Sequence, residues 1–394
     1  MKIGIDIRNI GKHRTGDEVV FFNLTKSLAD LDRQNNYFLC TDITDPIVLA
    51  DIADRLGLQD KPNFEIVSLK TKNRYTWNFW ALPRYLRQNP VDIYLTQYIT
   101  PFFVPKKIKI ATVVHDVSFK VYRKFIRFSD LFFLDILIPL SFKRADKIIG
   151  VSKFTADEII KYYKTAPEKV SWIHNAVGDN FKEAVSPQEI DAVRKKYNLP
   201  EKFILYIGTL QPRKNLPALI TAYSTLAEDT RAKIKLVLAG GKGHNYDPGI
   251  EKSIAEYSLE KDVFLPGFID EKDKPAIFMA CHVFCNPSFY EGFGITILEA
   301  MTLGIPVLAS MIPPHQEVAE NSVSYFNPED TEELTRLLAS VIADENLRNE
   351  LAHKELIQTK KFSWETTSQK LLELFNNLNN PEKKRAFFGH NQSD

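Results

Sequence analysis

Short apolar runs alternate with segments of helical periodicity along the whole chain, and this alternation sets the fold class. In the first half, apolar runs typical of buried strands occupy residues 2–7, 37–41, 64–68, 92–96 and 108–114. Helices are predicted over residues 18–31, near 128–143 and near 154–163. Strands that alternate with helices form parallel β-α-β units, because each helix returns the chain to the same end of the sheet.

The second half repeats the pattern. Predicted strands occupy residues 203–207, 234–239, 263–265, 282–285, 306–309 and 322–326, and most of them precede a helical segment. A chain of 394 residues also exceeds what one hydrophobic core usually fills. We therefore expect an α/β protein with two doubly wound, Rossmann-like sheets in series.

The expected boundary lies between the apolar residues 170–172 and a helix near 187–197, with residues 175–180 as a hinge. We expect a first domain over residues 1–180 and a second over 181–362. A C-terminal helix is predicted over residues 363–379, with Ser363 as its N-cap. The polar residues 380–394 are expected to be a disordered tail.

Composition excludes several classes of protein. The chain is 44% apolar and 26% charged, as in ordinary globular proteins. Its longest apolar stretch, residues 131–140, is interrupted by Asp135 and Pro139 and is about half as long as a bilayer span. No signal peptide is recognisable, and three cysteines suit a reducing compartment. We therefore expect a cytoplasmic protein.

The net charge of +1 conceals an asymmetry between the two halves. Residues 1–180 contain 27 Lys and Arg against 20 Asp and Glu, whereas the remainder contains 24 against 30. The cations are densest at residues 106–109, 123–127 and 143–144, among aromatic residues. This surface is either a solvated basic face or a peripheral contact with an anionic membrane or lipid-phosphate acceptor at the inner membrane face. No nucleic-acid partner is expected.

Two motifs that follow predicted strands in the second half carry the chemistry. One reads Asn286-Pro287-Ser288-Phe289-Tyr290-Glu291-Gly292-Phe293-Gly294 and opens a helix that carries Glu299. The other, upstream, reads Gly208-Thr209-Leu210-Gln211-Pro212-Arg213-Lys214-Asn215. Glycines at a helix start let backbone N–H groups approach an anionic ligand. Two cations and two acids at neighbouring strand ends suit a nucleotide diphosphate-sugar, because cations match the diphosphate and carboxylates accept from hydroxyls.

Each of these residues also has a structural interpretation. Glu291 and Glu299 taken alone are either ligands of sugar and ribose or a capping acid and a solvated helix acid. For Arg213 and Lys214 a functional role is favoured over a positively charged helix end on the surface. Cations at a helix N-terminus oppose the macrodipole and therefore need a local reason. His115 follows the strand at 108–114, where it is either a ligand or a structural histidine fixed by Asp116. Gly16 precedes Asp17, which we expect to be a helix-capping acid.

Metal-binding patterns are weak. Asp30-Leu31-Asp32 matches a D-x-D pattern but ends a helix with no strand before it. Cys281, His282 and Cys285 supply only three candidate ligands in a segment that otherwise indicates a buried helix end and strand. We expect no metal at either place.

Together these segments closely resemble the group 1 family of retaining glycosyltransferases, nucleotide-sugar-dependent enzymes of the GT-B class. The matching runs are Gly208-Thr209-Leu210 with Arg213-Lys214-Asn215, residues 287–294, and Leu298-Glu299-Ala300-Met301 with Gly304-Ile305-Pro306-Val307. They include the family's E-x(7)-E signature at Glu291 and Glu299. The resemblance covers nearly the whole chain, and it implies two Rossmann-like domains that face each other across a cleft.

By this resemblance, Arg213 and Lys214 bind the donor diphosphate, and Glu299 binds the ribose. It also implies that the donor sugar is bound by Glu291 with the amides of Phe293 and Gly294. The expected catalytic residues are His115, Arg213, Lys214 and Glu291, and the expected donor-binding residues are Gly16, Gly208, Phe293, Gly294 and Glu299. No cofactor or metal is implied. The helix from Trp364 would return to the first domain. The chain departs from the family pattern at Ile295-Thr296 and Ala176.

The sequence thus predicts transfer of a hexose, by family preference mannose, from a nucleotide diphosphate donor to a glycan or glycolipid acceptor with retention of configuration. A glycoside hydrolase built on the two glutamates is the nearest alternative enzyme, but it leaves Arg213 and Lys214 without a role. A nicotinamide-dependent oxidoreductase fails because Ile297 stands where its fingerprint needs glycine. A non-catalytic nucleotide-sugar-binding protein is a further alternative, and a measurement of donor turnover would distinguish it from the enzyme.

Overall fold

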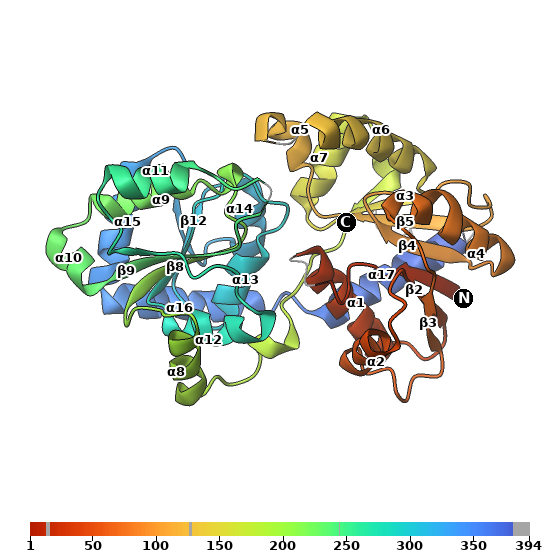
Figure 1. The fold of residues 1–394 in the computed structure, drawn as a ribbon, viewed down its shortest axis with the longest axis horizontal. Helices are drawn as coiled ribbons and strands as arrows, with labels where there is room; N and C mark the ends of the chain where they lie inside the picture. The colour runs from red at the N-terminus through yellow and green to blue at the C-terminus, as the bar shows by residue number, and fades with distance from the viewer. Residues whose placement is uncertain (13–15, 126–127, 244, 381–394) are drawn as a thin grey trace, which may run out of the picture. The chain divides into compact units, whose positions relative to one another are not determined.

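The computed structural model describes residues 1–12, 16–125, 128–243 and 245–380, which form two compact units (Figure 1). The first unit contains the described residues of 1–117, 128–175 and 363–380. The second contains the described residues of 118–127 together with 176–362. The main boundary falls at Asn175–Ala176, five residues before the one placed from the sequence. Residues 118–125, which were expected in the first domain, belong to the second unit. Residues 381–394 of the expected tail, and Ile126 and Arg127 of a basic segment, lie outside the described residues.

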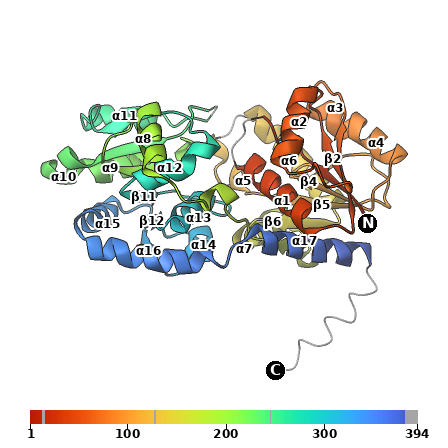
Figure 2. The same ribbon diagram turned by 90° about the horizontal axis from the view of Figure 1, so that it is seen from below.

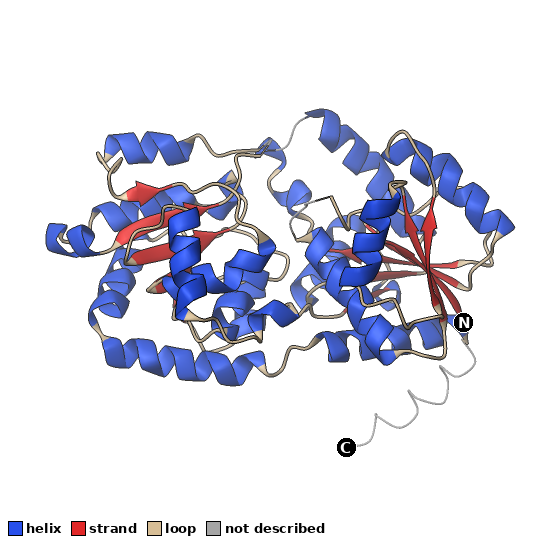
Figure 3. Ribbon diagram, turned by 60° about the horizontal axis from the view of Figure 1, so that its bottom comes forward, coloured by secondary structure: helices blue, strands red, loops and turns tan. Residues whose placement is uncertain are grey.

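A parallel sheet with the strand order β3-β2-β1-β4-β5-β6-β7 forms the centre of the first unit. The order reverses between β1 and β4, which is the mark of a doubly wound sheet. Its strands are β1 (Lys2–Asp6), β2 (Asn36–Thr41), β3 (Phe64–Ser68), β4 (Ile93–Gln97), β5 (Lys109–Val114), β6 (Lys147–Gly150) and β7 (Val170–Trp172). The helices around it are α1 (Asp17–Leu31), α2 (Pro46–Arg55), α3 (Arg74–Thr76), a π-helical turn (Trp77–Ala81), α4 (Leu82–Gln88), α6 (Phe128–Arg144), α7 (Lys153–Tyr163) and α17 (Trp364–Asn379) (Figure 3).

The last helix belongs to the first unit, and Figure 2 shows it in blue beside the red α1. It starts at Ser363, whose hydroxyl accepts from the Thr366 backbone N–H at 3.1 Å, so the predicted N-cap is confirmed. Two of its hydroxyls donate to this unit, Thr367 to the His174 carbonyl at 2.7 Å and Ser368 to Ser27 at 2.9 Å. Helix α17 is therefore an integral part of the first unit.

The second unit has a parallel sheet with the order β10-β9-β8-β11-β12-β13. Its order reverses between β8 and β11. The strands are β8 (Phe203–Ile207), β9 (Lys235–Ala239), β10 (Val263–Phe264), β11 (Val283–Asn286), β12 (Val307–Ser310) and β13 (Ser324–Phe326). The helices are α5 (Ser118–Val121), α8 (Pro187–Lys196), α9 (Leu216–Ser224), α10 (Glu228–Lys233), α11 (Gly249–Glu256), α12 (Lys274–Ala280), α13 (Ile295–Thr302), α14 (Pro313–Ala319), α15 (Thr331–Ala343) and α16 (Glu345–Thr359).

Both sheets confirm the doubly wound α/β fold class predicted from the alternating pattern. The predicted strands agree with the observed ones to within two residues, because each is a compact apolar run. The first-half prediction omitted β6 and β7, which are only four and three residues long. Among the described residues, no helix combines the length and the apolar character needed to cross a bilayer.

Candidate functional site

The two motifs of the second half meet where the order of its sheet reverses. Gly208 directly follows β8 and Ser288 comes two residues after the end of the neighbouring β11, at the carboxyl ends of parallel strands. Such a reversal point is where open α/β sheets bind ligands, because the loops of adjacent strands diverge there. The backbone N–H of Phe289 donates to the Arg213 carbonyl at 2.9 Å, which ties the two loops together.

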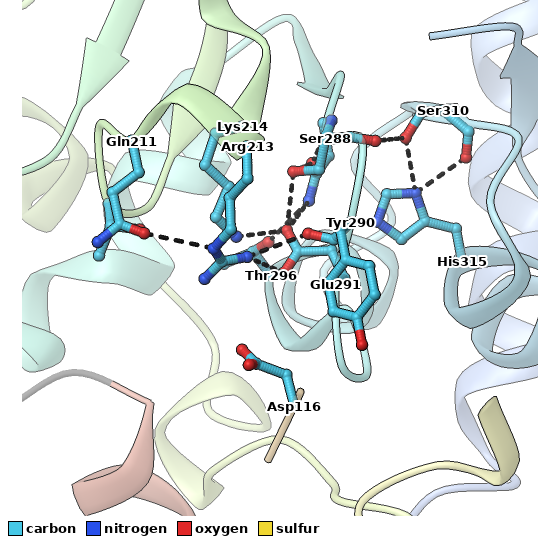
Figure 4. Close-up of polar contacts among 12 residues, drawn as sticks. Asp116, Gln211, Arg213, Lys214, Ser288, Tyr290, Glu291, Thr296, Ser310 and His315 are labelled. Atoms are coloured by element: carbon cyan, nitrogen blue, oxygen red, sulfur yellow. Dashed lines mark hydrogen bonds and ion pairs between the residues drawn. The ribbon is translucent and has the colours of Figure 1, made fainter. Parts of the chain in front are cut away.

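Arg213 and Lys214 lie on a 3₁₀ turn, residues Pro212–Lys214, rather than on the helix itself. Both reach Glu291: the Lys214 ammonium is 2.5 Å from Oε1, and the Arg213 guanidinium is 3.5 Å from Oε2 (Figure 4). Arg213 also donates to the Tyr290 carbonyl at 3.0 Å. The sequence places these cations and this acid in one site but does not predict that they pair with one another.

The environment of Glu291 keeps it ionised although most of its side chain is buried. Burial by itself would raise the pKa of Glu291, but the charges of Lys214 and Arg213 outweigh burial and hold that pKa far below its ordinary value. The Ser288 hydroxyl lies 2.8 Å from Glu291 Oε1 and 2.6 Å from Asn286 Oδ1, so its single proton serves one acceptor at a time. Ser288 and Asn286 are site residues that the sequence analysis did not single out.

The turn that follows Glu291 needs glycine at its last position for two reasons. Gly294 has φ 103°, in the region that side chains disfavour, and it directly precedes α13. A Cβ at this position would also lie 3.3 Å from the His315 ring. Phe293 is buried, with its ring 5.9 Å from that of Phe362. The loop between β11 and α13 is therefore fixed from both sides.

His315, which the sequence analysis missed, lies beneath this turn. Its Nδ1 is 2.9 Å from the Ser310 carbonyl oxygen, an acceptor, so this nitrogen carries the proton (Figure 4). Burial lowers the pKa of His315 to about 4, against the opposing charge of Glu291, so the ring is neutral. Nε2 is then an acceptor, and it is buried without a partner in the described part of the chain.

Glu299 lies in α13 and is almost completely buried. The Lys274 ammonium is 3.4 Å from one of its oxygens and 2.7 Å from Glu271. Burial raises the pKa of Glu299 to about 7, against the pull of Lys274. Burial also opposes the charge on Lys274, but Glu299 and Glu271 outweigh burial and raise the pKa of Lys274. The second oxygen of Glu299 is buried without a partner among the described residues, so one hydrogen-bond acceptor of this side chain is unsatisfied.

Gly208 and Gly240 approach each other at the start of the upstream motif. A Cβ on Gly240 would lie 1.9 Å from the Gly208 carbonyl oxygen, and one on Gly208 would lie 2.8 Å from the Tyr206 hydroxyl. The Gly208 backbone N–H also donates to the Ala239 carbonyl at 3.0 Å. Close packing thus explains these glycines without a ligand.

Two expected site residues belong to the first unit. His115 follows β5 and lies with its Nε2 2.9 Å from Gln97 Oε1. Burial lowers the pKa of His115, although Asp17 and Asp116 oppose the shift. Gly16 precedes α1 with φ 51°, and a Cβ there would meet no atom within 4 Å. Space therefore does not require glycine at position 16, whereas its backbone conformation favours it.

The residues of the two candidate metal-binding patterns either pair with other protein groups or are buried. Asp32 accepts from the Tyr37 hydroxyl and the Asn35 amide, both at 2.6 Å, and Asp30 pairs with Lys61 at 3.2 Å. Cys285 is buried in β11, where burial raises the pKa of its thiol. Within the described ranges, no group of three or more His, Cys, Asp or Glu residues is arranged to hold a metal ion.

Two family models match consecutive parts of the chain. Residues 188–355 match the model described as "Glycosyl transferases group 1". This matched segment contains both motifs of the second unit. Residues 15–181 match the model described as "Glycosyltransferase Family 4". The two models together extend from α1 to α16.

Relatives among known proteins agree with these models. The chain is 36% identical over 241 residues to the serotype-specific mannosyltransferase WbdA of Escherichia coli. The aligned region covers 60% of this chain but only 29% of that protein. The chain thus spans less than a third of the length of this relative. It is 29% identical to the O-antigen chain mannosyltransferase B of Escherichia coli, over 70% of this chain and 72% of the relative.

Solved structures share the fold at low sequence identity. Sucrose-phosphate synthase of Thermosynechococcus elongatus matches with a TM-score of 0.73 at 20% identity, over 96% of this chain and 99% of that chain. Anabaena HepE, solved in complex with UDP and glucose, matches with a TM-score of 0.72 at 19% identity, over 96% of this chain and 100% of that chain. With both family models and this architecture, the chain belongs to the group 1 glycosyltransferases and has the GT-B fold of two Rossmann-like domains.

Proposed function

We propose that this protein transfers a hexose, by family preference mannose, from a nucleotide diphosphate donor to a glycan or glycolipid acceptor during polysaccharide synthesis, with retention of configuration. The observation that carries the proposal is the largely buried, paired group of Arg213, Lys214 and Glu291 at the reversal point of the second sheet. The mannosyltransferase relatives support mannose and a glycan acceptor. Retention rests on the family resemblance.

Arg213 and Lys214 are suited to stabilise the leaving group. In the transfer, the bond from the anomeric carbon to the β-phosphate oxygen breaks, and negative charge accumulates on the departing diphosphate. Cations that meet this charge stabilise the transition state more than the ground state, which is the requirement for catalysis. The acceptor oxygen bonds to the anomeric carbon from the same face, and its proton passes to the departing phosphate oxygen.

The acids are suited to hold hydroxyl groups. Glu291 is held as a carboxylate by the two cations, and we assign it to the donor sugar with the amides of Phe293 and Gly294. We assign Glu299 to the ribose, because its unpartnered oxygen is an acceptor without a donor among the described residues. The roles of His115 at a sugar hydroxyl and of Gly16 and Gly208 by the donor rest on the family resemblance.

The pairing of Glu291 also separates this proposal from a glycoside hydrolase. A hydrolase needs a carboxylic acid that protonates the leaving group and a second carboxyl group across the scissile bond. Glu291 is neutralised by two cations, an arrangement that suits a charged ligand rather than a neutral glycoside. A nucleotide-sugar donor gives all three residues a role.

A donor panel tests the proposal. The full chain is mixed with GDP-mannose, UDP-glucose, UDP-galactose and ADP-glucose, and thermal stabilisation and slow donor hydrolysis are measured. At least one nucleotide-sugar should raise the melting temperature and be hydrolysed. Binding without any turnover, even with a polysaccharide acceptor present, would support the non-catalytic binding protein instead. No stabilisation by any nucleotide-sugar would contradict both.

A further inference from the structure

The first unit exposes large apolar side chains that its core does not use. Trp80 is 62% exposed, Phe103 68% and Phe132 55%. Monomeric soluble proteins rarely gather so many large apolar groups at one place on their surface, and such patches mark interaction sites. We call the following residues the aromatic face: Trp80, Phe103, Phe132, Phe133, Ile136 and Leu140.

Ring contacts show that the aromatic face is continuous. The Phe79 ring, next to Trp80, lies 4.6 Å from Phe102 in a stacked pair and 6.3 Å from Phe103. The Tyr75 ring, just before the π-helical turn, lies 5.5 Å from Phe133 of α6. On the core side, the Thr100 backbone N–H donates to the buried Ser141 hydroxyl of α6 at 3.1 Å, which fixes the loop against this helix. The π-helical turn, the loop after β4 and α6 therefore form one surface.

The loop holds Phe103 outward at a conformational cost. Phe103 has φ 61°, a left-handed backbone that is rare for a bulky residue and persists only where its surroundings enforce it. The Arg87 guanidinium donates to the Phe103 carbonyl at 2.9 Å, and the Phe102 backbone N–H donates to the Asn78 carbonyl at 2.9 Å. These bonds keep an exposed aromatic side chain in place rather than letting it turn inward.

Helix α6 is apolar on its solvent side as well as on its core side. Leu131, Ile138 and Phe142 are buried, whereas Phe132, Ile136 and Leu140 are exposed at a spacing of four residues. A surface helix of a globular protein normally turns charged residues to the solvent. The outer stripe of α6 is therefore suited to an apolar partner.

The part of the aromatic face around Trp80 and Phe103 is rich in cations, whereas α6 contains two acids and two cations. Residues 70–109 contain eight Lys and Arg but only one acid, Asp92. The Arg84 guanidinium lies 5.5 Å from the centre of the Trp80 ring, and Lys106 and Lys107 are exposed beside the loop of Phe103. Aromatic side chains with adjacent cations are typical of the boundary between water and the acyl chains of an anionic bilayer.

We propose that the aromatic face docks the first unit onto the surface of an anionic lipid bilayer, with Trp80 and Phe103 at the level of the headgroups. The charge decides between a bilayer and a second copy of this chain, because two such basic surfaces would repel each other. This inference goes beyond the proposed function, since bilayer binding requires no donor and is measured without turnover.

Vesicle flotation tests the inference with the full chain and no substrate. Phosphatidylcholine vesicles with about one third phosphatidylglycerol should carry the wild type upward, and vesicles of phosphatidylcholine alone should carry much less. Trp80→Ser with Phe103→Ser should weaken binding by about tenfold or more, because two aromatic anchors are lost. Lys106→Gln with Lys107→Gln should weaken it by about fivefold for each charge removed.

Two controls separate docking from loss of the fold. Ile47→Ser removes an apolar side chain that is 81% exposed on α2, outside the aromatic face, and should bind vesicles as the wild type does. Brominated lipids should quench the wild-type tryptophan fluorescence, and Trp80→Phe should lose most of this quenching while it still binds.

Three results would overturn the inference. The first is that the wild type does not float with the vesicles at any lipid concentration. The second is a Trp80→Ser, Phe103→Ser variant that floats as well as the wild type. The third is a wild type that forms dimers in light scattering without binding vesicles, if that variant abolishes the dimers; the aromatic face would then be a contact between copies.

Discussion

The two acids of the E-x(7)-E motif have opposite electrostatic surroundings. Glu291 is paired with Lys214 and Arg213 and stays ionised, whereas burial raises the pKa of Glu299 to about 7. Under the proposed function, Glu291 belongs to the charged group at the reacting end of the donor. Glu299 keeps one oxygen without a partner in the described part of the chain, which suits a hydroxyl at the other end.

The two acids should accordingly differ in their kinetic effects. Glu299→Gln should raise donor KM by about tenfold and leave a measurable kcat, since one charged hydrogen-bond acceptor for the bound donor is lost. Glu291→Gln should lower kcat more than it changes KM. Steady-state kinetics at saturating acceptor measure both, with Glu350→Gln on the surface of α16 as the matched control. If Glu291→Gln left kcat untouched while Glu299→Gln abolished it, the two roles would be reversed.

The pH dependence of donor binding provides an independent check on Glu299. The ionised carboxylate accepts hydroxyl protons better than the protonated acid, and its pKa is about 7. Donor KM of the wild type should therefore fall as the pH rises through about 7, and Glu299→Gln should lose this dependence. A variant that kept the wild-type pH profile of KM would show that another group titrates.

Sequence patterns predicted the motif residues but not the residues that position them. Arg213, Lys214, Glu291 and Glu299 stand in recognisable runs at strand ends. Lys274 and His315 come from the helices before and after α13, outside the motif, and only the folded structure shows that they reach it. Nothing local distinguishes either of them from an ordinary helix residue.

At the scale of elements, one buried acid links α16 to β12. Glu355 is completely buried, and its carboxylate accepts from the Val307 backbone N–H at 2.9 Å, at the start of the strand. Its other oxygen is buried without a partner among the described residues. Burial raises the pKa of Glu355 from 4.5 to about 8, so the folded protein favours the neutral acid.

This acid should make the folded protein less stable as the pH rises. A raised pKa stabilises the fold fully below the unfolded value of 4.5, and the contribution is lost as the pH rises to about 8. Between pH 5.5 and 7.5, the wild type should lose about 2 kcal/mol more free energy of unfolding than Glu355→Gln. Urea titrations followed by circular dichroism measure the difference. Equal changes in the two proteins would show that Glu355 does not titrate in this range.

Predicted elements were most accurate where the pattern was long and uniform. The amphipathic run at residues 18–31 became α1 (Asp17–Leu31), and the cap at Ser363 started α17. The prediction for the segment of Arg213 and Lys214 was less accurate. The two residues were expected at the start of a helix, but Asn215 adopts φ 56° and separates their 3₁₀ turn from α9. Tertiary contacts, here the hydrogen bond from the Asn215 amide to the Pro328 carbonyl at 2.8 Å, set such details.

At the scale of the whole molecule, the chain repeats one architecture and divides its chemistry between the repeats. Both sheets are parallel and reverse their order once, yet the paired cations and acids gather in the second unit and the aromatic face belongs to the first. The alternating pattern predicted the repeated architecture. The sequence offered a membrane contact at the basic, aromatic segments of the first half as one alternative. It did not show which apolar residues are exposed, because those of α6 and of the π-helical turn are indistinguishable from core residues in the sequence.

Activity should not depend on a divalent metal ion. Arg213 and Lys214 would take the place that a metal occupies beside the diphosphate in metal-dependent transfer. Glycosyl transfer measured after dialysis against EDTA should retain its rate, and added Mg²⁺ or Mn²⁺ should change it little. Complete loss on chelation with recovery on adding either ion would require a metal site and contradict this account.

The most direct test of the central claim is the turnover of Lys214→Ala with the donor that the panel identifies. If Lys214 and Arg213 stabilise the departing diphosphate, this variant should keep its fold and lower kcat by about 100-fold or more, in line with the loss of one preorganised electrostatic donor. Lys354→Ala, which removes a surface ammonium paired with Glu350 on α16, should keep the wild-type rate. A folded Lys214→Ala protein with near-normal kcat would contradict the assignment of the leaving-group site.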